Sequence, residues 1–302
     1  MPKLETRRLG RTEMKPKALG LGCAFLGSPQ RAPDEEAVAT VRQAIELGID
    51  FVDTAAGYGG GESERRVGLA LEGGWREKVY LQTKVGSHPT RPHDFSGEAT
   101  RWSLENSLKL LKTEYLDSVL IHAPPDIESL LRPGQVMDVL LKMKEEGVIG
   151  HLGVGVRGHA IHREAIESGQ IDIVLSFLDY TLLSQSAART TIPLARKHDV
   201  GIILASVQGM GLLAGPEPVD EVERARYPDR EPRAHAMWQW CRNHDVNIRH
   251  LAMQFCMAAP IDGIVMSGPA NRQQVDEAYE AATATVPEEV WGAFNAEFGV
   301  GL

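Results

Sequence analysis

Short apolar runs alternate with longer amphipathic stretches along almost the whole chain, and this alternation limits the possible folds more than any other feature. Each run is brief, rich in β-forming residues and almost continuously hydrophobic, as expected of a strand that is buried on both faces. The runs lie at residues 18–22, 50–54, 79–83, 117–122, 151–156, 172–177, 200–206 and 263–268. Strands of this kind are typical of parallel sheets that are covered by helices.

The stretches between the runs have the period of amphipathic helices. The first covers residues 34–48, with Asp34 as the expected N-cap and Gly48 as the residue that follows the helix. Eight strand–helix units in succession predict an α/β fold of the (β/α)8 or TIM barrel type. The main alternative is a doubly wound open sheet, which usually has a GxGxxG fingerprint after a strand. No such fingerprint occurs in that context here.

Two segments do not belong to the repeat. Residues 3–17 predict a short N-terminal β-hairpin whose turn is LGRTE, residues 9–13. Residues 214–233 are rich in proline and charge and predict an exposed loop on the catalytic side. No linker or change in composition divides the 302 residues, so we expect one barrel domain over residues 1–302.

Composition argues against several classes of partner. Lys and Arg number 32 against 41 Asp and Glu, a net charge of −9 with no basic run, so we expect no nucleic-acid binding. No stretch approaches the roughly 18 uninterrupted apolar residues of a membrane helix, and the N-terminus lacks a signal-peptide core. Cys23, Cys241 and Cys256 form no CxxC, and the pair His159 and His162 has no third ligand at a matching place. We expect a cytoplasmic protein without a membrane or metal site, and its oligomeric state is left open.

Four polar residues stand where the second, third and fourth expected strands end. They are Asp53, Tyr58 in the loop after it, Lys84 and His122. Reactive groups of a barrel lie at these strand ends, so the four side chains can meet in one pocket. We expect Lys84 to lower the pKa of the Tyr58 phenol from about 10 toward the range of a general acid. Asp53 would keep Lys84 charged, and His122 would donate a hydrogen bond to the substrate oxygen.

The segments that contain these residues resemble the aldo-keto reductases, a family of barrel oxidoreductases that use NAD(P)(H). The resemblance is carried by DFVDTAAGYGGGESERRVGLAL, QTKVG and DSVLIHAPP, and it extends from about Leu9 to Ala282. It implies that Asp53, Tyr58, Lys84 and His122 are the catalytic tetrad. The runs YTLLSQ and GLGCAFLG resemble most the branch of sugar and pyridoxal dehydrogenases, which includes L-fucose and D-threo-aldose dehydrogenases.

The resemblance also implies a cofactor that lies extended over the mouth of the barrel. GLGCAFLG would line the nicotinamide end, ASVQGMGLLAG would form the pyrophosphate loop, and SGPANRQQVDEA would bind the adenosine phosphate. Backbone N–H groups in glycine-rich loops and at a helix N-terminus suit an anion. The implied cofactor-binding residues are Gly22, Asp53, Ser206, Gly209, Leu212, Gly268, Arg272 and Gln274.

Three positions depart from the family pattern around the nicotinamide. Arg157 replaces a common asparagine, Phe177 replaces a common glutamine, and Ala205 replaces an aromatic residue that often stacks on the nicotinamide. We hypothesise that Phe177 supplies the missing stacking surface. The departures bring turnover rate and cofactor preference into question more than cofactor binding itself.

The cofactor form depends on the residues that follow the last strand. The lysine that many family members use for a 2′-phosphate is not evident, since Met266 precedes Ser267, but Arg272 is a candidate. We therefore expect NADP(H) first and NAD(H) second. Arg272 and Gln274 are equally compatible with plain positions on a helix surface.

Three function classes follow from these residues together with the family resemblance. The first is an oxidoreductase that transfers hydride between a nicotinamide and a sugar or another small aldehyde, ketone or alcohol, with Tyr58 as general acid and base. The second is a lyase in which Lys84 forms a Schiff base. The third is a cofactor-binding sensor or partner subunit with little turnover. The sequence leaves the substrate and the direction of reaction open, because specificity lies in the loops.

Overall fold

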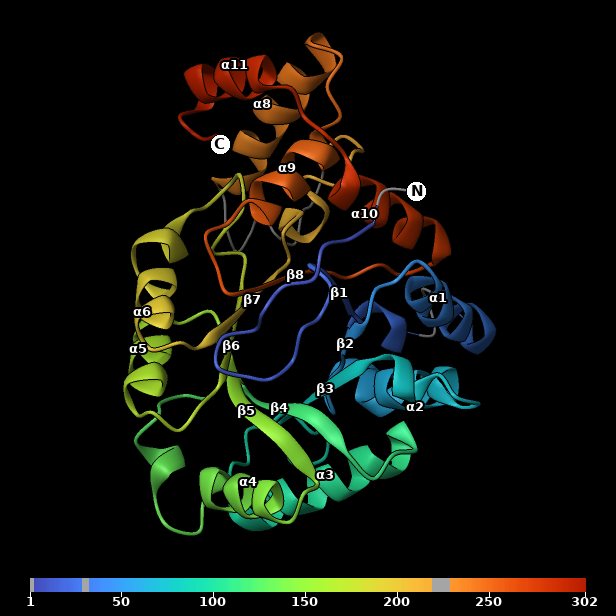
Figure 1. Ribbon diagram of the computed structural model, residues 1–302, viewed down its shortest axis with the longest axis vertical. Coiled ribbons are helices and arrows are strands. Elements are labelled where there is room, and N and C mark those ends of the chain that lie inside the picture. Colours follow the sequence, from blue (N-terminus) through green and yellow to red (C-terminus); the bar gives the residue numbers. More distant parts are fainter. Residues whose placement is uncertain (1–2, 29–32, 219–228) are drawn as a thin grey trace.

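A computed structural model describes residues 3–28, 33–218 and 229–302. Eight parallel strands form a closed barrel in which each strand pairs with the next in sequence and β1 pairs with β8 (Figure 1). The strands are β1 Leu19–Gly22, β2 Phe51–Asp53, β3 Tyr80–Val85, β4 Leu116–His122, β5 Ile149–Gly155, β6 Ile173–Phe177, β7 Gly201–Ala205 and β8 Gly263–Ser267. The predicted (β/α)8 fold is confirmed, and every strand overlaps the apolar run that predicted it.

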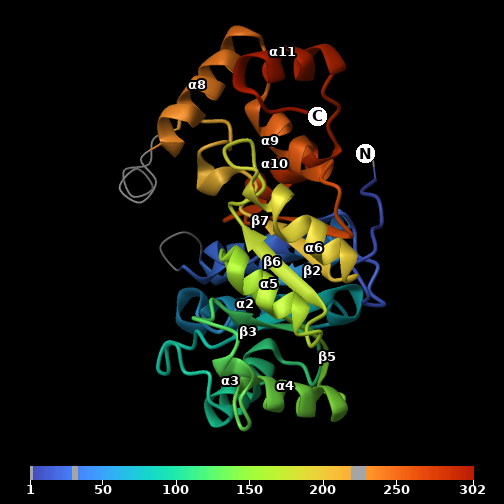
Figure 2. The ribbon, with the colours of Figure 1, turned by 90° about the vertical axis from the view of Figure 1, so that its left-hand side faces the viewer.

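Helices surround the barrel, and most of them cover the outward faces of the strands, whereas α8 and α11 lie farther out (Figure 1). They are α1 Asp34–Glu46, α2 Glu62–Leu71, α3 Gly97–Leu111, α4 Val136–Glu145, α5 His159–Glu167, α6 Thr191–Lys197, α8 Arg230–Asn243, α9 Ile248–Met257, α10 Arg272–Thr283 and α11 Glu288–Phe298. The sequence did not predict α9 and α11. The helices α8 and α11 lie together at one end of the molecule, far from α3 and α4 (Figure 2). None of the helices in the described ranges is long and apolar enough to span a membrane.

Two apolar clusters hold this arrangement together. The larger lies between the barrel and its helices, and the smaller fills the barrel interior with side chains such as Phe51, Leu120 and Ile203. Leu9 and Met14 of the N-terminal segment join the interior cluster. This segment pairs antiparallel with itself at Thr6 and Lys17, as the expected hairpin requires, and crosses the barrel (Figure 1).

Two local expectations need correction. Helix α1 begins at Asp34, but Pro33 occupies the N-cap position and the Asp34 carboxylate instead pairs with Arg65 and Arg66 at 2.7 and 2.9 Å. Gly48, with φ at +93°, does follow the helix as expected. The loop expected at residues 214–233 ends earlier, because α8 begins at Arg230. Residues 219–228 of that loop lie outside the described residues.

Candidate active site

Asp53 and Lys84 form a buried ion pair inside the barrel mouth, at the ends of β2 and β3. Lys84 Nζ lies 2.7 and 2.6 Å from the two Asp53 carboxylate oxygens and 2.7 Å from the Thr54 carbonyl oxygen. Burial lowers the pKa of Lys84. The charges and hydrogen bonds of Asp53 and Tyr58 raise it by more than burial lowers it, so the net shift of the pKa is upward. Lys84 is therefore held as a cation, as the sequence predicted.

Two further polar residues, which the sequence analysis missed, support this pair. Gln82 Nε2 donates to Asp53 Oδ1 at 2.7 Å, and Ser118 Oγ donates to Gln82 Oε1 at 2.9 Å. Gln82 precedes Lys84 by two residues on β3, so both side chains face the barrel interior. This strand period is the signal that could have identified Gln82. The carboxylate of Asp53 is therefore oriented as well as paired.

Tyr58 begins the short 3-10 helix η2, Tyr58–Gly61, and its side chain reaches back over Lys84. Lys84 Nζ lies 4.6 Å from the centre of the phenol ring. Burial raises the pKa of Tyr58, and the lowering by Lys84 does not offset it. Lys84 does act to lower the pKa of Tyr58, as expected, but the expected net fall in that pKa is wrong. The physical reason is that the phenolate loses more by desolvation than it gains from the ammonium.

His122 completes the group at the end of β4. Its ring meets that of Tyr58 edge to face, with 5.7 Å between the ring centres. Burial, with the nearby Lys84 and His93, lowers the pKa of His122 to about 3. The imidazole is therefore neutral at ordinary pH. Its Nδ1 atom lies 2.8 Å from Ser87 Oγ.

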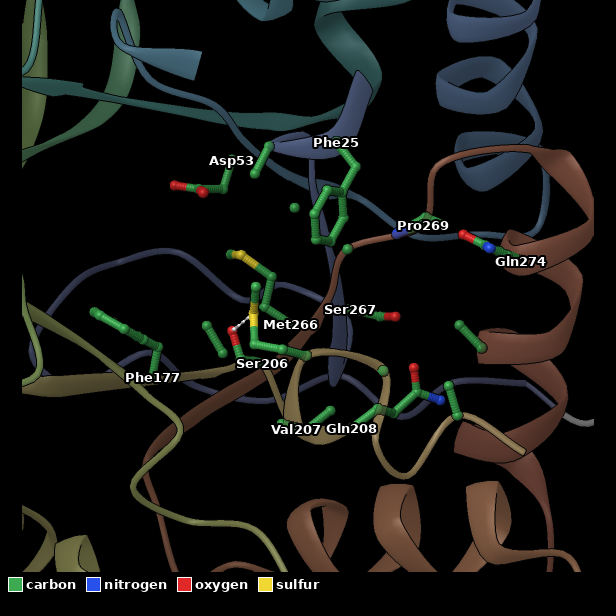
Figure 3. A pocket seen from close by; sticks show the side chains of 18 of the residues that line it. Phe25, Asp53, Phe177, Ser206, Val207, Gln208, Met266, Ser267, Pro269 and Gln274 are labelled. Carbon is green, nitrogen blue, oxygen red and sulfur yellow. Dashed lines mark hydrogen bonds between the residues drawn. The ribbon is translucent and has the colours of Figure 1, made fainter. Parts of the chain in front are cut away.

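A cavity of about 620 Å³ starts at this tetrad, Asp53, Tyr58, Lys84 and His122, and extends to the first turn of α10. Figure 3 shows its lining side chains from Asp53 and Phe177 at one side to Gln274 at the other. Strands β1, β7 and β8, together with the loops that follow them, supply more than half of the lining residues, as the fold predicts for a barrel site. The cavity has the size of a small-molecule or cofactor site.

The residues expected to bind a cofactor divide into two groups. Gly22, Asp53, Ser206, Gly268 and Gln274 line the cavity. Gly209, Leu212 and Arg272 are not among the lining residues. Besides Ser206, the expected pyrophosphate loop contributes further lining residues, namely Ala205, Val207, Gln208, Met210, Gly211 and Ala214. The Leu212 side chain is packed in the core, with an exposed fraction of 2%.

Arg272 is not among the lining residues and pairs with a residue of α1. Its guanidinium pairs with the Glu36 carboxylate at 3.2 Å, and the side chain is 55% exposed. The pairing also lowers the pKa of Glu36. Gln274, by contrast, lines the cavity and accepts a hydrogen bond from the Ala270 backbone N–H at 2.7 Å.

A second ion pair, absent from the sequence analysis, lies in the cavity wall near α10. Arg249 Nη2 is 3.2 Å from Glu277 Oε2, and Arg249 Nε donates to the Ala214 carbonyl oxygen at 2.9 Å. Both side chains line the cavity. Glu277 is three residues after Gln274 and shares its helix face, which is the signal that could have found it. Arg249 lies on α9, a helix that the sequence did not predict.

Two of the three departures from the family pattern line this cavity, and the third does not. Phe177 and Ala205, which end β6 and β7, line the cavity. Arg157 does not line it and pairs with Asp179 at 3.0 Å. The wall beside the tetrad is therefore aromatic and aliphatic rather than amidic.

The aldo/keto reductase family model matches residues 18–296. The chain is 32% identical to L-galactose dehydrogenase of Arabidopsis thaliana over 94% of its length and 89% of that protein. It is 30% identical to D-threo-aldose 1-dehydrogenase of a Pseudomonas species over 91% of its length and 92% of that protein. The structure resembles the holo form of an aldo-keto reductase from Bacillus halodurans with a TM-score of 0.78, 25% identity and 97% and 96% coverage of the two chains. The chain belongs to the aldo/keto reductase family and is an NAD(P)-dependent oxidoreductase.

Proposed function

We propose that this protein transfers hydride between a nicotinamide and the carbonyl or alcohol carbon of a sugar or another small aldehyde or ketone. The observation that carries the proposal is a single cavity that joins the tetrad to the start of α10. A dinucleotide needs such an elongated site, and the positive end of the helix dipole at the start of α10 favours its phosphates. The nicotinamide, when bound, supplies or accepts the hydride.

Tyr58 is the proposed proton donor in reduction and the acceptor in oxidation. The pKa of its phenol is raised by burial, so it carries its proton before reduction begins. When that proton passes to the substrate oxygen, the phenolate that forms lies beside the Lys84 ammonium. A cation at about 4 Å contributes roughly 4 kcal/mol at an effective dielectric constant near 20, before desolvation is subtracted. Asp53 holds that cation in place, and neutral His122 can donate to the substrate oxygen.

The proposed cofactor form is NAD(H). The sequence-based expectation of NADP(H) depends on Arg272, whose charge is taken up by Glu36 outside the cavity. In the cavity wall, the charge of Arg249 is matched by Glu277. A carboxylate there can accept a hydrogen bond from a ribose 2′-hydroxyl and repels a 2′-phosphate.

Two relatives support a sugar as substrate. One acts on L-galactose and the other on D-threo-aldoses, according to their names. The lyase alternative has less support, because Lys84 is a poor nucleophile while Asp53 and Thr54 hold its ammonium group. Borohydride trapping with a carbonyl substrate should therefore yield no covalent adduct.

The test begins with fluorescence titrations of the protein with NADH and NADPH, followed by turnover assays with a panel of aldoses. We expect saturable binding, and oxidation of an aldose or reduction of a carbonyl compound. A Tyr58→Phe variant should bind the cofactor as the wild type does but turn over about 10²–10⁴-fold more slowly. An absence of binding below millimolar concentration would refute the proposal. Tight binding without turnover over the whole panel would instead favour a sensor or partner subunit.

A further inference from the structure

Ser87 stands at the edge of the His122 ring, just after β3. Its Oγ lies 2.8 Å from His122 Nδ1. The preceding residue, Gly86, has φ at +88°, and a Cβ there would lie 2.1 Å from the Phe95 ring. The chain therefore turns at a position that only glycine fits, and this turn brings Ser87 to the histidine.

Ser87 also packs against the segment that carries Tyr58. A Cβ on Gly57 would lie 2.6 Å from the Ser87 carbonyl oxygen and 3.0 Å from its Oγ. The φ of Gly57 is an ordinary −82°, so the space taken by Ser87 is what excludes a larger residue there. Ser87 is thus packed between the chain segment before Tyr58 and the ring of His122.

The two possible roles of the Ser87 hydroxyl are not equivalent. The His122 ring is neutral, because its pKa is lowered to about 3 by burial, Lys84 and His93, so it has one hydrogen to place on either nitrogen. Within the described ranges, Ser87 Oγ has no hydrogen-bond partner other than Nδ1. If Oγ accepted a hydrogen from Nδ1, its own hydrogen would lack a protein acceptor. If Oγ donates, its hydrogen is satisfied and the imidazole hydrogen must be on Nε2.

The second ring nitrogen is then the one that can serve the reaction. Among the described residues, His122 Nε2 has no protein partner, and the His122 side chain lines the cavity. We propose that Ser87 is a positioning residue that donates to His122 Nδ1 and thereby fixes the tautomer with hydrogen on Nε2, available to the substrate oxygen. The catalytic part of this inference depends on the proposed function, in which His122 donates a hydrogen bond to the substrate oxygen. The assignment of the tautomer does not depend on the proposed function.

The direct test is the protonation state of the ring nitrogens. Long-range ¹H–¹⁵N correlation spectra of the full chain, labelled at histidine and assigned with a His122→Gln variant, distinguish the two tautomers without cofactor or substrate. We expect one tautomer, with hydrogen on Nε2, in the wild type. A Ser87→Ala variant should give a mixture, and Ser87→Thr should restore the single form. Hydrogen on Nδ1 in the wild type, or an unchanged tautomer in Ser87→Ala, would overturn the inference.

Kinetics supply the second readout. Loss of one oriented hydrogen bond should lower kcat/KM for the carbonyl substrate about 10-fold in Ser87→Ala, while the Kd of NADH stays unchanged. Ser87→Thr should recover most of the rate. Thr90→Ala is the matched control, since its hydroxyl lies 3.0 Å from His88 rather than His122. An undiminished kcat/KM in Ser87→Ala would contradict the catalytic part of the inference. An inactive wild type would instead contradict the proposed function, and the spectra would still decide the tautomer of His122.

Discussion

Lys84 Nζ lies within 2.7 Å of both carboxylate oxygens of Asp53, and both side chains are almost completely shielded from solvent. Removing one partner of such a pair leaves an uncompensated buried charge, which typically costs about 3–5 kcal/mol. The pair is therefore a structural as well as a chemical element of the site.

The first prediction separates these two contributions. Asp53→Asn and Lys84→Met should each lower the free energy of unfolding by about 3–5 kcal/mol. The double variant should be less destabilised than the sum of the two, because neither charge remains. Urea unfolding followed by tryptophan fluorescence measures this coupling. Turnover should be reduced more than about 10²-fold in all three variants. Additive losses of stability would show that the two charges are not coupled.

The second prediction concerns Phe177, which ends β6 and lines the cavity. If its ring stacks on the nicotinamide, Phe177→Ala should weaken NADH binding by about 2–13-fold, as expected for a loss of about 0.5–1.5 kcal/mol. ADP-ribose lacks the nicotinamide, so its Kd should not change. Titration of the wild type and of Phe177→Ala with both ligands tests this. Equal weakening for NADH and ADP-ribose would place the Phe177 contact elsewhere on the cofactor.

The third prediction concerns cofactor choice. The wild type should bind NADH more tightly than NADPH, because Glu277 neutralises Arg249, the cation in the cavity wall that could otherwise pair with a 2′-phosphate. Glu277→Gln removes that charge and should raise the affinity for NADPH about 10-fold, or about 1.4 kcal/mol. Fluorescence titration gives both Kd values.

Glu36→Gln is the matched control for this substitution. It frees Arg272, which lies outside the cavity lining, and should leave the ratio of the two affinities unchanged. A larger gain of NADPH affinity in Glu36→Gln than in Glu277→Gln would instead identify Arg272 as the residue that reads the 2′-phosphate.

The fourth prediction is a loss of stability in mild acid. His162 is fully buried, its Nδ1 atom lies 2.9 Å from Thr191 Oγ1 and its Nε2 atom 3.0 Å from the Val156 carbonyl oxygen. Burial, with nearby His159, lowers the pKa of His162 to about 4, although the Val156 carbonyl and Asp179 oppose the shift. Between about pH 6.5 and this value, the unfolded chain binds a proton at His162 that the folded chain does not. Stability should therefore fall as the pH falls, by up to about 1.4 kcal/mol per unit.

Other groups contribute to the same pH range. His122 acts in the same direction as His162, whereas burial raises the pKa of Asp50 and of Glu64, which act in the opposite direction. A comparison of variants isolates one histidine. In thermal unfolding from pH 7 to 4.5, His162→Gln should show a smaller loss of Tm than the wild type. His235→Gln, at a partly exposed position, should follow the wild type. Parallel curves for all three proteins would exclude His162 as a source of the acid sensitivity.

The sequence by itself determined the strand–helix alternation and the positions of Asp53, Tyr58, Lys84 and His122. These features are local, because a continuous apolar run indicates a buried strand and the polar residue after the run indicates where the strand ends. The same local reasoning could have found Gln82, which shares the inward face of β3 with Lys84.

Only the tertiary structure decided which groups meet across the fold. Arg272 pairs with Glu36, which is 236 residues away in sequence, and Arg249 meets Glu277 from a helix that the apolar pattern did not reveal. The pKa of Tyr58 was misjudged for the same reason, since the charge of Lys84 can be anticipated from the sequence but the desolvation of the phenol cannot. Periodicity reports which face of an element is buried, whereas partners and burial depend on how distant elements pack.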